Sequence, residues 1–267
     1  MGMRIALPPT LLAMALFADS RLQVDLVERS VIEARLATGT VSHEERETTV
    51  AELFRSAGCE VEFQKVARNA NNVICRLPGA DPSSPVVVVG AHYDFANVGQ
   101  GIIDDWTGAS LLASLYQALK PQPRKNNYTF VAFAKEETGL EGSGKFVKSL
   151  DKSQRQAIRA FVNIECLGTT PLKIWIKRST PELVRRMTRL AATLKTPISG
   201  MDVDAVGDDD SHSFQDAKIP VISLHSLDND TLQLIHSKRD RLEAIQFEQY
   251  FASYRLIAFF LAYLDAP

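Results

Sequence analysis

The amino-acid sequence predicts an α/β fold in which a mostly parallel, mixed central sheet carries helices on both faces. Short runs of apolar and β-branched residues, typical of strands buried on both sides, occupy residues 86–89, 129–134 and 160–164. Apolar residues at helical spacing lie between these runs, at 109–119 and 144–150. Because strands that alternate with crossover helices pair in parallel, the helices should cover both sides of one open sheet.

The flanking segments predict further elements of both kinds. Before the first central strand, apolar spacing favours a helix over 22–37, and a capping box at 42–45 opens a second helix that Gly58 stops. Alternating residues predict a hairpin of two strands, at 61–66 and 72–78. After the last central strand, we expect strands at 172–176 and 221–224 and helices at 181–194 and 248–264.

Composition excludes several classes of function. The chain has 267 residues, of which 45% are hydrophobic, so that it can bury a full core, and we expect a single catalytic domain over 19–267. The formal net charge is −2 and the basic residues are spread along the chain, which gives no reason to expect nucleic-acid binding. No apolar stretch reaches the roughly 20 residues that span a bilayer, so we expect no membrane insertion.

The first residues and the cysteines bear on location. Arg4 followed by an apolar stretch to Ala18 has the order of a short secretory signal, although Pro8 and Pro9 interrupt it. Residues 1–18 are therefore either a signal peptide or a disordered N-terminus, and the protein is secreted or periplasmic in the first case and cytoplasmic in the second. The three cysteines form no CxxC pair, and we do not expect disulfides to organise the fold.

Candidate functional residues gather where the predicted strands end. Ligands on open α/β sheets bind outside the carboxyl ends of the strands. The side chains suited to chemistry at these ends and in the neighbouring loops are His92, Asp94, Asp104, Asp105, Glu136, Glu137, Glu165, His236 and Asp240. Unpaired buried carboxylates cost several kcal/mol, so a cluster of them is better explained by a metal site than by stability.

Each of these features alone also has a structural interpretation. His92 could be a satisfied histidine near a turn, Asp104 and Asp105 could cap the next helix, and the adjacent Glu136 and Glu137 could form a solvated turn. Glu165 could form an ion pair. For the second imidazole the alternatives to His236 are His43, His212 and His225. The order of the motifs along the chain is what favours the metal site.

That order resembles the co-catalytic zinc exopeptidases typified by the bacterial leucyl aminopeptidases, a group that includes the glutaminyl cyclases. The resemblance runs from about residue 22 to the end of the chain. It rests on five spaced motifs, at 90–94, 103–108, 134–139, 162–168 and 235–240, with lesser matches at 72–79 and 210–220. It implies the zinc-exopeptidase architecture, which is phosphorylase/hydrolase-like, for the whole catalytic domain.

The resemblance also implies a site with two zinc ions. Asp104 would bridge them, with His92 and Glu165 on one ion and Glu137 and His236 on the other. Glu136 would be the general base, Asp94 would orient His92, and the peptide bond after Asp104 would be cis. Spacing alone does not decide between Asp104 and Asp105; the alignment on Gly108 does. Imidazole and carboxylate ligands with an open position are typical of catalytic zinc.

We expect this chain to hydrolyse N-terminal peptide bonds of peptide substrates. A glutaminyl-cyclase-like zinc acyltransferase that forms N-terminal pyroglutamate, a zinc carboxypeptidase of the same clan and a non-catalytic binding protein are the alternatives. Two departures from the family pattern bear on this choice. The aminopeptidases usually have Asp where this chain has Glu165, whereas the carboxypeptidase types have Glu, and Lys135 occupies a position that is often acidic in relatives.

Overall fold

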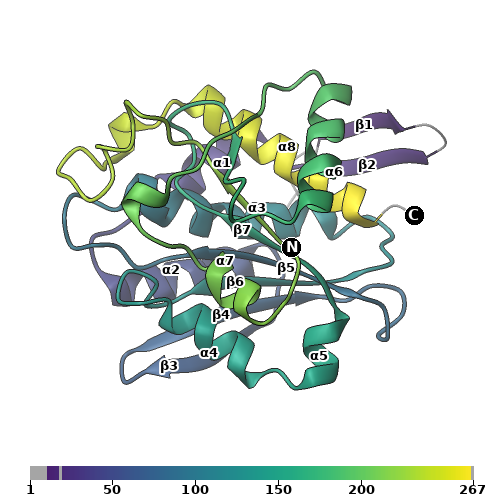
Figure 1. Cartoon of the computed structure of the whole chain (residues 1–267), viewed down its shortest axis with the longest axis horizontal. Helices are drawn as coiled ribbons and strands as arrows, with labels where there is room; N and C mark the ends of the chain where they lie inside the picture. Colours follow the sequence, from purple (N-terminus) through teal and green to yellow (C-terminus); the bar gives the residue numbers. More distant parts are fainter. Residues whose placement is uncertain (1–10, 18–19, 266–267) are drawn as a thin grey trace, which may run out of the picture.

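The centre of the fold is an eight-stranded mixed sheet with the strand order β3-β4-β6-β5-β7-β10-β8-β9. Strands β3 to β7 of this sheet are labelled in Figure 1. The computed structural model describes residues 11–17 and 20–265. The sheet strands are β3 (Val61–Ala67), β4 (Ala70–Leu77), β5 (Val86–His92), β6 (Asn127–Phe133), β7 (Ile158–Ile164), β8 (Lys173–Ile174), β9 (Ser199–Gly200) and β10 (Val221–His225). The predicted mostly parallel, mixed sheet is confirmed, because β6, β5, β7 and β10 pair in parallel while β3, β4 and β8 pair with antiparallel neighbours.

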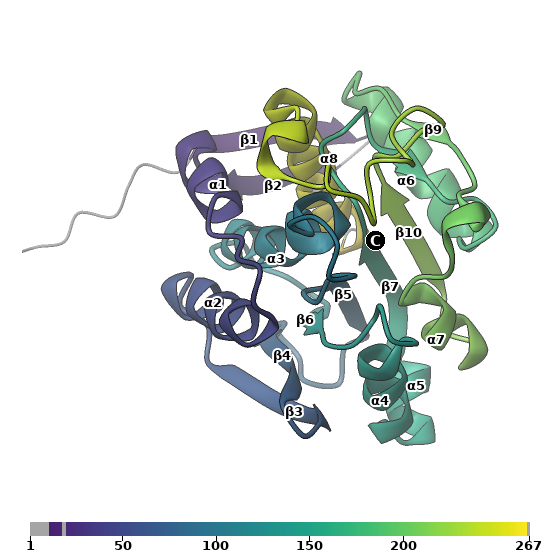
Figure 2. The same ribbon diagram turned by 90° about the vertical axis from the view of Figure 1, so that its left-hand side faces the viewer.

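Helices cover both faces of this sheet, and the strands alternate their side chains between two cores. The helices are α1 (Arg29–Leu36), α2 (His43–Ser56), α3 (Thr107–Leu119), α4 (Glu141–Ser149), α5 (Lys152–Ala157), α6 (Pro181–Thr193), α7 (Ser211–Asp216) and α8 (Phe247–Asp265). In β5, Val87 and Val89 join the core under α1, α2, α3, α6 and α8, whereas Val88 joins the core under α4 and α7. Figure 2 shows α2 and α3 on one side of the sheet and α4 on the other. A strand buried on both faces reads as a continuous apolar run for this reason.

The pairing directions bring the carboxyl ends of four strands to one edge. Strand β5 ends at His92, β6 at Phe133, β7 at Ile164 and β10 at His225, and these four strands run in the same direction. The residues that follow each strand therefore start from neighbouring positions, even though they are far apart in the sequence. The candidate residues predicted from the sequence lie at the ends of these four strands or in the segments that follow them, with His236 and Asp240 in the long segment after β10.

The segment predicted as a helix over 22–37 is instead a strand followed by a shorter helix. Residues Ser20–Leu26 form β2, which pairs antiparallel with β1 (Leu11–Phe17), and α1 begins only at Arg29. Leu22 and Leu26 fit a helical spacing, but with Val24 they also alternate, and all three are buried. Packing of β2 beside α8, where the Val27 backbone N–H donates to the Tyr254 hydroxyl at 2.8 Å, selects the strand. Much of the predicted signal segment, residues 1–10 and 18, lies outside the described residues.

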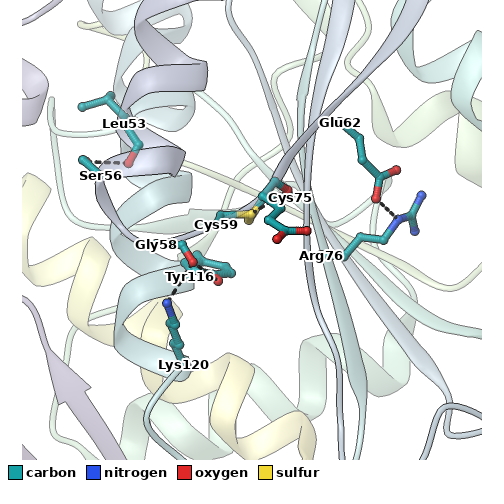
Figure 3. Close-up of a disulfide and its surroundings, with 10 residues drawn as sticks. Leu53, Ser56, Gly58, Cys59, Glu62, Cys75, Arg76, Tyr116 and Lys120 are labelled. Atoms are coloured by element: carbon teal, nitrogen blue, oxygen red, sulfur yellow. Dashed lines mark hydrogen bonds and ion pairs between the residues drawn. A yellow bond between two sulfur atoms is a disulfide. The ribbon is translucent and has the colours of Figure 1, made fainter.

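A disulfide links Cys59, just after α2, to Cys75 in β4 (Figure 3). The expectation that disulfides do not organise the fold was therefore wrong for this hairpin. The register explains the pairing: Val61 lies opposite Cys75, so the chain entering β3 passes beside it. Next to it, the Gly58 carbonyl accepts hydrogen bonds from the Tyr116 hydroxyl and from Lys120, which ties the hairpin to α3.

Among the described residues, no helix combines the length and apolarity needed to cross a membrane.

Candidate metal centre

A first trio of side chains meets around the last residue of β5. The His92 imidazole is fully buried, and its Nε2 lies 3.1 Å from Asp104 Oδ1 and 3.0 Å from Glu165 Oε1. Asp104 comes from the segment before α3, and Glu165 directly follows β7. The potential ligand atoms of the trio all lie within 4.8 Å of one another, close enough to share one metal ion.

A second trio shares Asp104 with the first. His236 Nε2 lies 3.0 Å from Asp104 Oδ2 and 3.2 Å from Glu137 Oε2, and these atoms again lie within 4.8 Å of one another. His236 belongs to the loop before α8 and has a left-handed backbone with φ of 51°. Each oxygen of the Asp104 carboxylate therefore faces a different histidine. The structure thus brings together all five residues predicted as zinc ligands, with Asp104 between the other four.

Asp94 and the backbone hold the ligands in place. His92 Nδ1 donates to the backbone carbonyl of Asp94 at 3.1 Å, whereas the nearer Asp94 carboxylate oxygen is 3.7 Å away. This hydrogen bond leaves Nε2 with its lone pair available for a metal. The Asp94 carboxylate instead accepts from the backbone N–H groups of Glu136 at 3.0 Å and Glu137 at 3.3 Å. Asp94 thus orients His92 through its backbone carbonyl, whereas its carboxylate fixes the glutamate pair.

Asp105 and Asp240 position the loop that carries Asp104. Asp105 Oδ1 accepts from the backbone N–H groups of Gly108 and Cys166, both at 3.0 Å, so this aspartate caps α3 and is not in either trio. Asp240 Oδ1 accepts from Ile103 N–H at 2.6 Å, and its Oδ2 accepts from Asp104 N–H at 3.3 Å. The peptide bond between Asp104 and Asp105 is cis, as the family resemblance implies.

A polar network behind Glu165 was not predicted from the sequence. Asn163, in β7, donates through Nδ2 to Glu165 Oε2 and to Asp209 Oδ2, at 3.1 Å in each case. The hydroxyl groups of Ser211 and Ser223 also donate to Asp209. The available signal was a buried amide inside an otherwise apolar strand, since buried polar groups need partners. The network fixes the orientation of the Glu165 carboxylate, whose only other contact within the first trio is with His92.

Burial and crowding shift the pKa values of these groups. Burial, with the nearby Glu165 and Asp210, raises the pKa of Glu136 to about 11, and burial raises that of Glu165 to about 7. Burial would raise the pKa of Asp104, but hydrogen bonds from His236 and His92 outweigh it and hold this pKa below its usual range. The hydrogen bond from His236 to Asp104 raises the pKa of this imidazole to about 10. So many acidic groups at one point favour a bound cation.

The two trios fit metal ions in their chemistry as well as their spacing. Each offers one imidazole nitrogen and two carboxylate oxygens, which are ligands that zinc takes. Glu137 Oε1 is buried and has no hydrogen-bond partner within residues 11–17 and 20–265, so this carboxylate has bonding capacity left for an ion. The other candidate imidazoles lie outside both trios: His43 stacks on Phe95, His212 pairs with Asp208, and His225 contacts the Met201 carbonyl.

Two cavities adjoin the centre, and both are lined in part by Glu137 and His236. The first, called here the Trp175 cavity, has a volume of about 260 Å³ and is also lined by Cys166, Trp175, Val203, Leu227 and Ile235. The second, called the Phe95 cavity, has a volume of about 970 Å³ and is also lined by His43, Arg68, Phe95, Asn97 and Lys135. The centre thus lies between a small apolar space and a larger polar one.

Comparison with known proteins gives aminopeptidases among the relatives. The chain is 28% identical to leupeptin-inactivating enzyme 1 of Streptomyces exfoliatus over 182 residues, which is 67% of this chain and 39% of that protein. It is 32% identical to probable leucine aminopeptidase 2 of Aspergillus fumigatus over 114 residues, which is 43% of this chain and 23% of that protein. The matched segment thus spans less than two fifths of each of these relatives.

Solved structures share the fold. The LapA aminopeptidase of Legionella pneumophila superposes with a TM-score of 0.80 and 19% identity, covering 90% of this chain and 73% of that one. A glutaminyl cyclase of an Acidobacteriales bacterium superposes with a TM-score of 0.72 and 16% identity, covering 89% of this chain and 93% of that one. Both likenesses support the predicted architecture.

A family model identifies the chain more directly. The model described as Peptidase family M28 matches residues 72–261, which include both trios, Asp94, Glu136 and the whole of the parallel centre of the sheet. The match extends over more than half of the chain, and it agrees with the resemblance that the motifs showed. This chain therefore belongs to peptidase family M28.

Proposed function

We propose that the protein is an aminopeptidase that uses two zinc ions to hydrolyse the first peptide bond of a peptide. The observation that carries the proposal is the Asp104 carboxylate, whose oxygens lie 3.1 Å from His92 Nε2 and 3.0 Å from His236 Nε2. Such a carboxylate suits a bridge between two metal ions. His92 and Glu165 would complete one site, and Glu137 and His236 the other.

Glu136 is the proposed proton carrier. When bound, zinc ions polarise a carbonyl group and lower the pKa of water. Glu136 belongs to neither trio, but its Oε2 lies 3.9 Å from His92 Nε2, so its carboxylate faces the same space. With the cations bound, their positive charge would lower the pKa of this carboxyl group from its raised value in the metal-free protein. The Glu136 carboxylate then accepts a proton from the attacking water and returns it to the amine that leaves. Asp94 supports this role because its carboxylate fixes the Glu136 backbone.

The Trp175 cavity is the proposed place for the N-terminal side chain. Its volume of about 260 Å³ has room for one large residue, and apolar side chains line most of it. Burial of an apolar side chain there contributes roughly 25 cal/mol per Å² of apolar surface. We therefore expect a preference for leucine-like residues at the N-terminus. The buried carboxylates around the centre favour the positive charge of a free α-amine.

Glutaminyl-cyclase chemistry is the second candidate. The cyclase fold likeness covers 93% of the cyclase chain, so the two domains have similar extents, and Glu165 departs from the residue usual in aminopeptidases. A cyclase forms pyroglutamate from an N-terminal glutamine and releases ammonia instead of an amino acid. The complete pair of trios favours hydrolysis, because cyclisation requires only one zinc ion.

Export is the proposed location. The disulfide between Cys59 and Cys75 supports it, because such bonds persist in oxidising compartments. The charged and then apolar order of residues 1–18 supports it independently. If the protein is exported, mass spectrometry of protein from the extracellular or periplasmic fraction should find the disulfide formed and residues 1–18 removed. Protein confined to the cytoplasm with both thiols reduced would contradict this location.

Metal analysis combined with turnover tests the activity. Purified protein is stripped with a chelator, reloaded with zinc, and assayed with leucine 4-nitroanilide, a glutaminyl peptide and a peptide blocked at its N-terminus. We expect two zinc ions per chain and release of amino acid only from the free N-terminus. Pyroglutamate formation without released amino acid would establish the cyclase. Cleavage of the blocked peptide from its C-terminus would establish a carboxypeptidase, and no turnover at all would favour a binding protein.

A further inference from the structure

The Phe95 cavity contains two positively charged side chains that form no ion pair with the described residues around them. Lys135 and Arg68 line it, and among the residues that the structure describes neither side chain makes an ion pair or hydrogen bond. Two of the carboxylates that line the same cavity are already engaged, Asp94 by backbone N–H groups and Glu137 by His236. The remaining one, Glu44, is exposed in the first turn of α2. The unengaged groups are thus two cations, Lys135 and the exposed Arg68, and one exposed carboxylate, Glu44, so the balance of unengaged charge in the cavity is positive.

Lys135 is held at a fixed place next to the metal ligands. It directly precedes Glu136 and Glu137, is half-buried, and has a left-handed backbone with φ of 63°. Its carbonyl accepts a hydrogen bond from Glu141 N–H at 3.0 Å, which anchors the turn to the start of α4. Non-glycine residues rarely adopt this conformation. The turn therefore orients the Lys135 side chain differently from the side chains of neighbouring residues.

Another part of the cavity lining is held by contacts between its side chains. The His43 ring stacks on Phe95 with ring centroids 4.5 Å apart, and its Nε2 lies 3.1 Å from Asn97 Oδ1. The cavity thus combines an aromatic surface, an amide and two cationic groups, and it opens directly onto Glu137 and His236. A peptide that places its N-terminal side chain in the Trp175 cavity has its remaining residues on this side of the centre. The volume of about 970 Å³ has room for several residues.

We propose that the Phe95 cavity binds the portion of the substrate after the cleaved bond, and that Lys135 and Arg68 bind its terminal carboxylate. The natural substrates are then short peptides with a free C-terminus, such as dipeptides and tripeptides. This inference rests on the proposed aminopeptidase function and adds a substrate class to it. A carboxylate is the ligand that ammonium and guanidinium groups pair with most strongly, and the guanidinium can do so bidentately.

Matched substrates test the proposal. Leu-Gly and Leu-Gly-Gly are compared with the same peptides amidated at the C-terminus, and leucine 4-nitroanilide serves as a substrate without a carboxylate. The two lengths are needed because each added residue extends the chain by roughly 3.4 Å. For at least one of the two lengths, we expect the peptide with a free carboxylate to have a KM about fivefold to tenfold lower than the amidated peptide. We expect the kcat values of the two to agree within about twofold. A KM difference of this size is typical of a partly exposed charge pair.

Variants separate a binding role from a structural one. Lys135→Met should remove most of the KM difference between acid and amide, Arg68→Met part of it, and the double variant all of it. Lys135→Arg should retain the difference. Turnover of leucine 4-nitroanilide should stay within about twofold of the wild type in every variant. Lys148→Met, at an exposed lysine in the last turn of α4, is the matched control and should change nothing.

The outcomes are distinguishable. If leucine 4-nitroanilide is hydrolysed but the acid and amide have equal KM values, this inference is wrong and the aminopeptidase function stands. If the double variant keeps the wild-type preference, or loses activity equally on all substrates, Lys135 and Arg68 do not bind the carboxylate. If neither leucine 4-nitroanilide nor the peptides are hydrolysed, the proposed function and this inference fail together.

Discussion

At the scale of single residues, the central feature is a pair of adjacent glutamates with different roles. Glu137 Oε2 lies 3.2 Å from His236 Nε2 within a trio, whereas Glu136 is outside both trios and its closest approach to His92 Nε2 is 3.9 Å. The two backbone N–H groups bind the same carboxylate, that of Asp94. Their roles therefore differ because the backbone points the two side chains differently, and not because their surroundings differ in kind.

Replacing each glutamate by glutamine should separate the two roles. Glu136→Gln should keep the zinc content and thermal stability of the wild type but lower kcat by a factor on the order of 10² to 10⁴, because an amide cannot carry the proton. Glu137→Gln should instead lose zinc from one site, because an amide is a weaker ligand than a carboxylate. Metal content by mass spectrometry and kcat with leucine 4-nitroanilide are the measurements.

Glu141→Gln is a suitable control for both variants. This exposed glutamate lies at the start of α4, close to the pair in sequence but in neither trio, and its replacement should alter neither zinc nor kcat. Equal loss of metal in Glu136→Gln and Glu137→Gln would show that the assignment of base and ligand is wrong.

The sequence indicated which residue types meet at the site, but not how they are held. The ligand set followed from the family resemblance, and spacing alone left Asp104 and Asp105 as alternatives. The contribution of Asp240 could not be foreseen, because its partners are backbone N–H groups more than 130 positions away in the sequence. Asn163 stands out as a buried amide in an apolar strand, but its link to Asp209, 46 positions away, could not be foreseen. Hydrogen bonds of this kind depend on the tertiary structure and leave no local pattern.

At the scale of elements, one buried arginine joins α2 to the loop that leads to the site. The Arg46 side chain has no exposed surface and donates to four backbone carbonyls, those of Thr40, Tyr93, Gln100 and Gly101, at 2.5 to 3.1 Å. Its guanidinium also lies 4.6 Å from the ring centroid of Phe95. Burial lowers its pKa to about 10, and the nearby carboxylates of Asp240 and Asp105 limit this shift.

Removing this arginine should destabilise the fold and loosen the site together. Arg46→Met leaves four carbonyls without their donor, and an unsatisfied buried acceptor costs about 1 to 3 kcal/mol, so we expect the free energy of unfolding to fall by about 3 kcal/mol or more. Zinc should also bind more weakly, because the segment from Tyr93 to Gly101 precedes Asp104. Urea denaturation and a zinc competition assay are the measurements.

An exposed arginine in a helix provides the comparison. Arg189, in α6, is exposed, and Arg189→Met should change the free energy of unfolding by no more than about 0.5 kcal/mol. If Arg46→Met unfolds at the same urea concentration as Arg189→Met, the carbonyl contacts of Arg46 contribute no stability and its proposed role is wrong.

The long central strands were predictable as elements, whereas the short and exposed ones were not. Strands β5, β6 and β7 are buried on both faces, so their apolar runs stand out, and the structure extends each predicted run by a few residues. Strand β8 covers only Lys173–Ile174 of the predicted 172–176, and α5 and α7 were not predicted. The helix α5 has no buried side chain and therefore leaves no apolar pattern to detect.

For the molecule as a whole, metal binding should be coupled to protons. Without metal, hydrogen bonds with Asp104 and Glu137 raise the pKa of His236 to about 10, and the carboxylates around His92 raise its pKa despite burial. The His236 imidazole is then protonated at pH 7, and His92 holds its proton more strongly than a free imidazole does. An imidazole must lose this proton before a metal can bind. Zinc binding therefore releases protons, and the zinc affinity rises as pH rises and falls as pH falls.

Calorimetry measures this coupling. Titration of zinc into metal-free protein at pH 7, in two buffers of different ionisation enthalpy, should show release of at least about two protons for full loading. His236→Gln should release about one proton fewer. Because zinc binds the folded state only, loading should also raise Tm, and a chelator should lower it again. A heat of binding that is independent of the buffer would contradict the protonated imidazoles.

The spread of the ligands along the chain has a consequence for biosynthesis. His92 and His236, which share the Asp104 carboxylate, belong to β5 and to the loop before α8, so more than half of the 267-residue chain separates them. While the chain leaves the ribosome, the second trio cannot form until His236 and Asp240 have emerged. Until residue 240 has emerged, a growing chain thus contains at most the first trio, and only after that point can the protein acquire the full metal complement proposed for it.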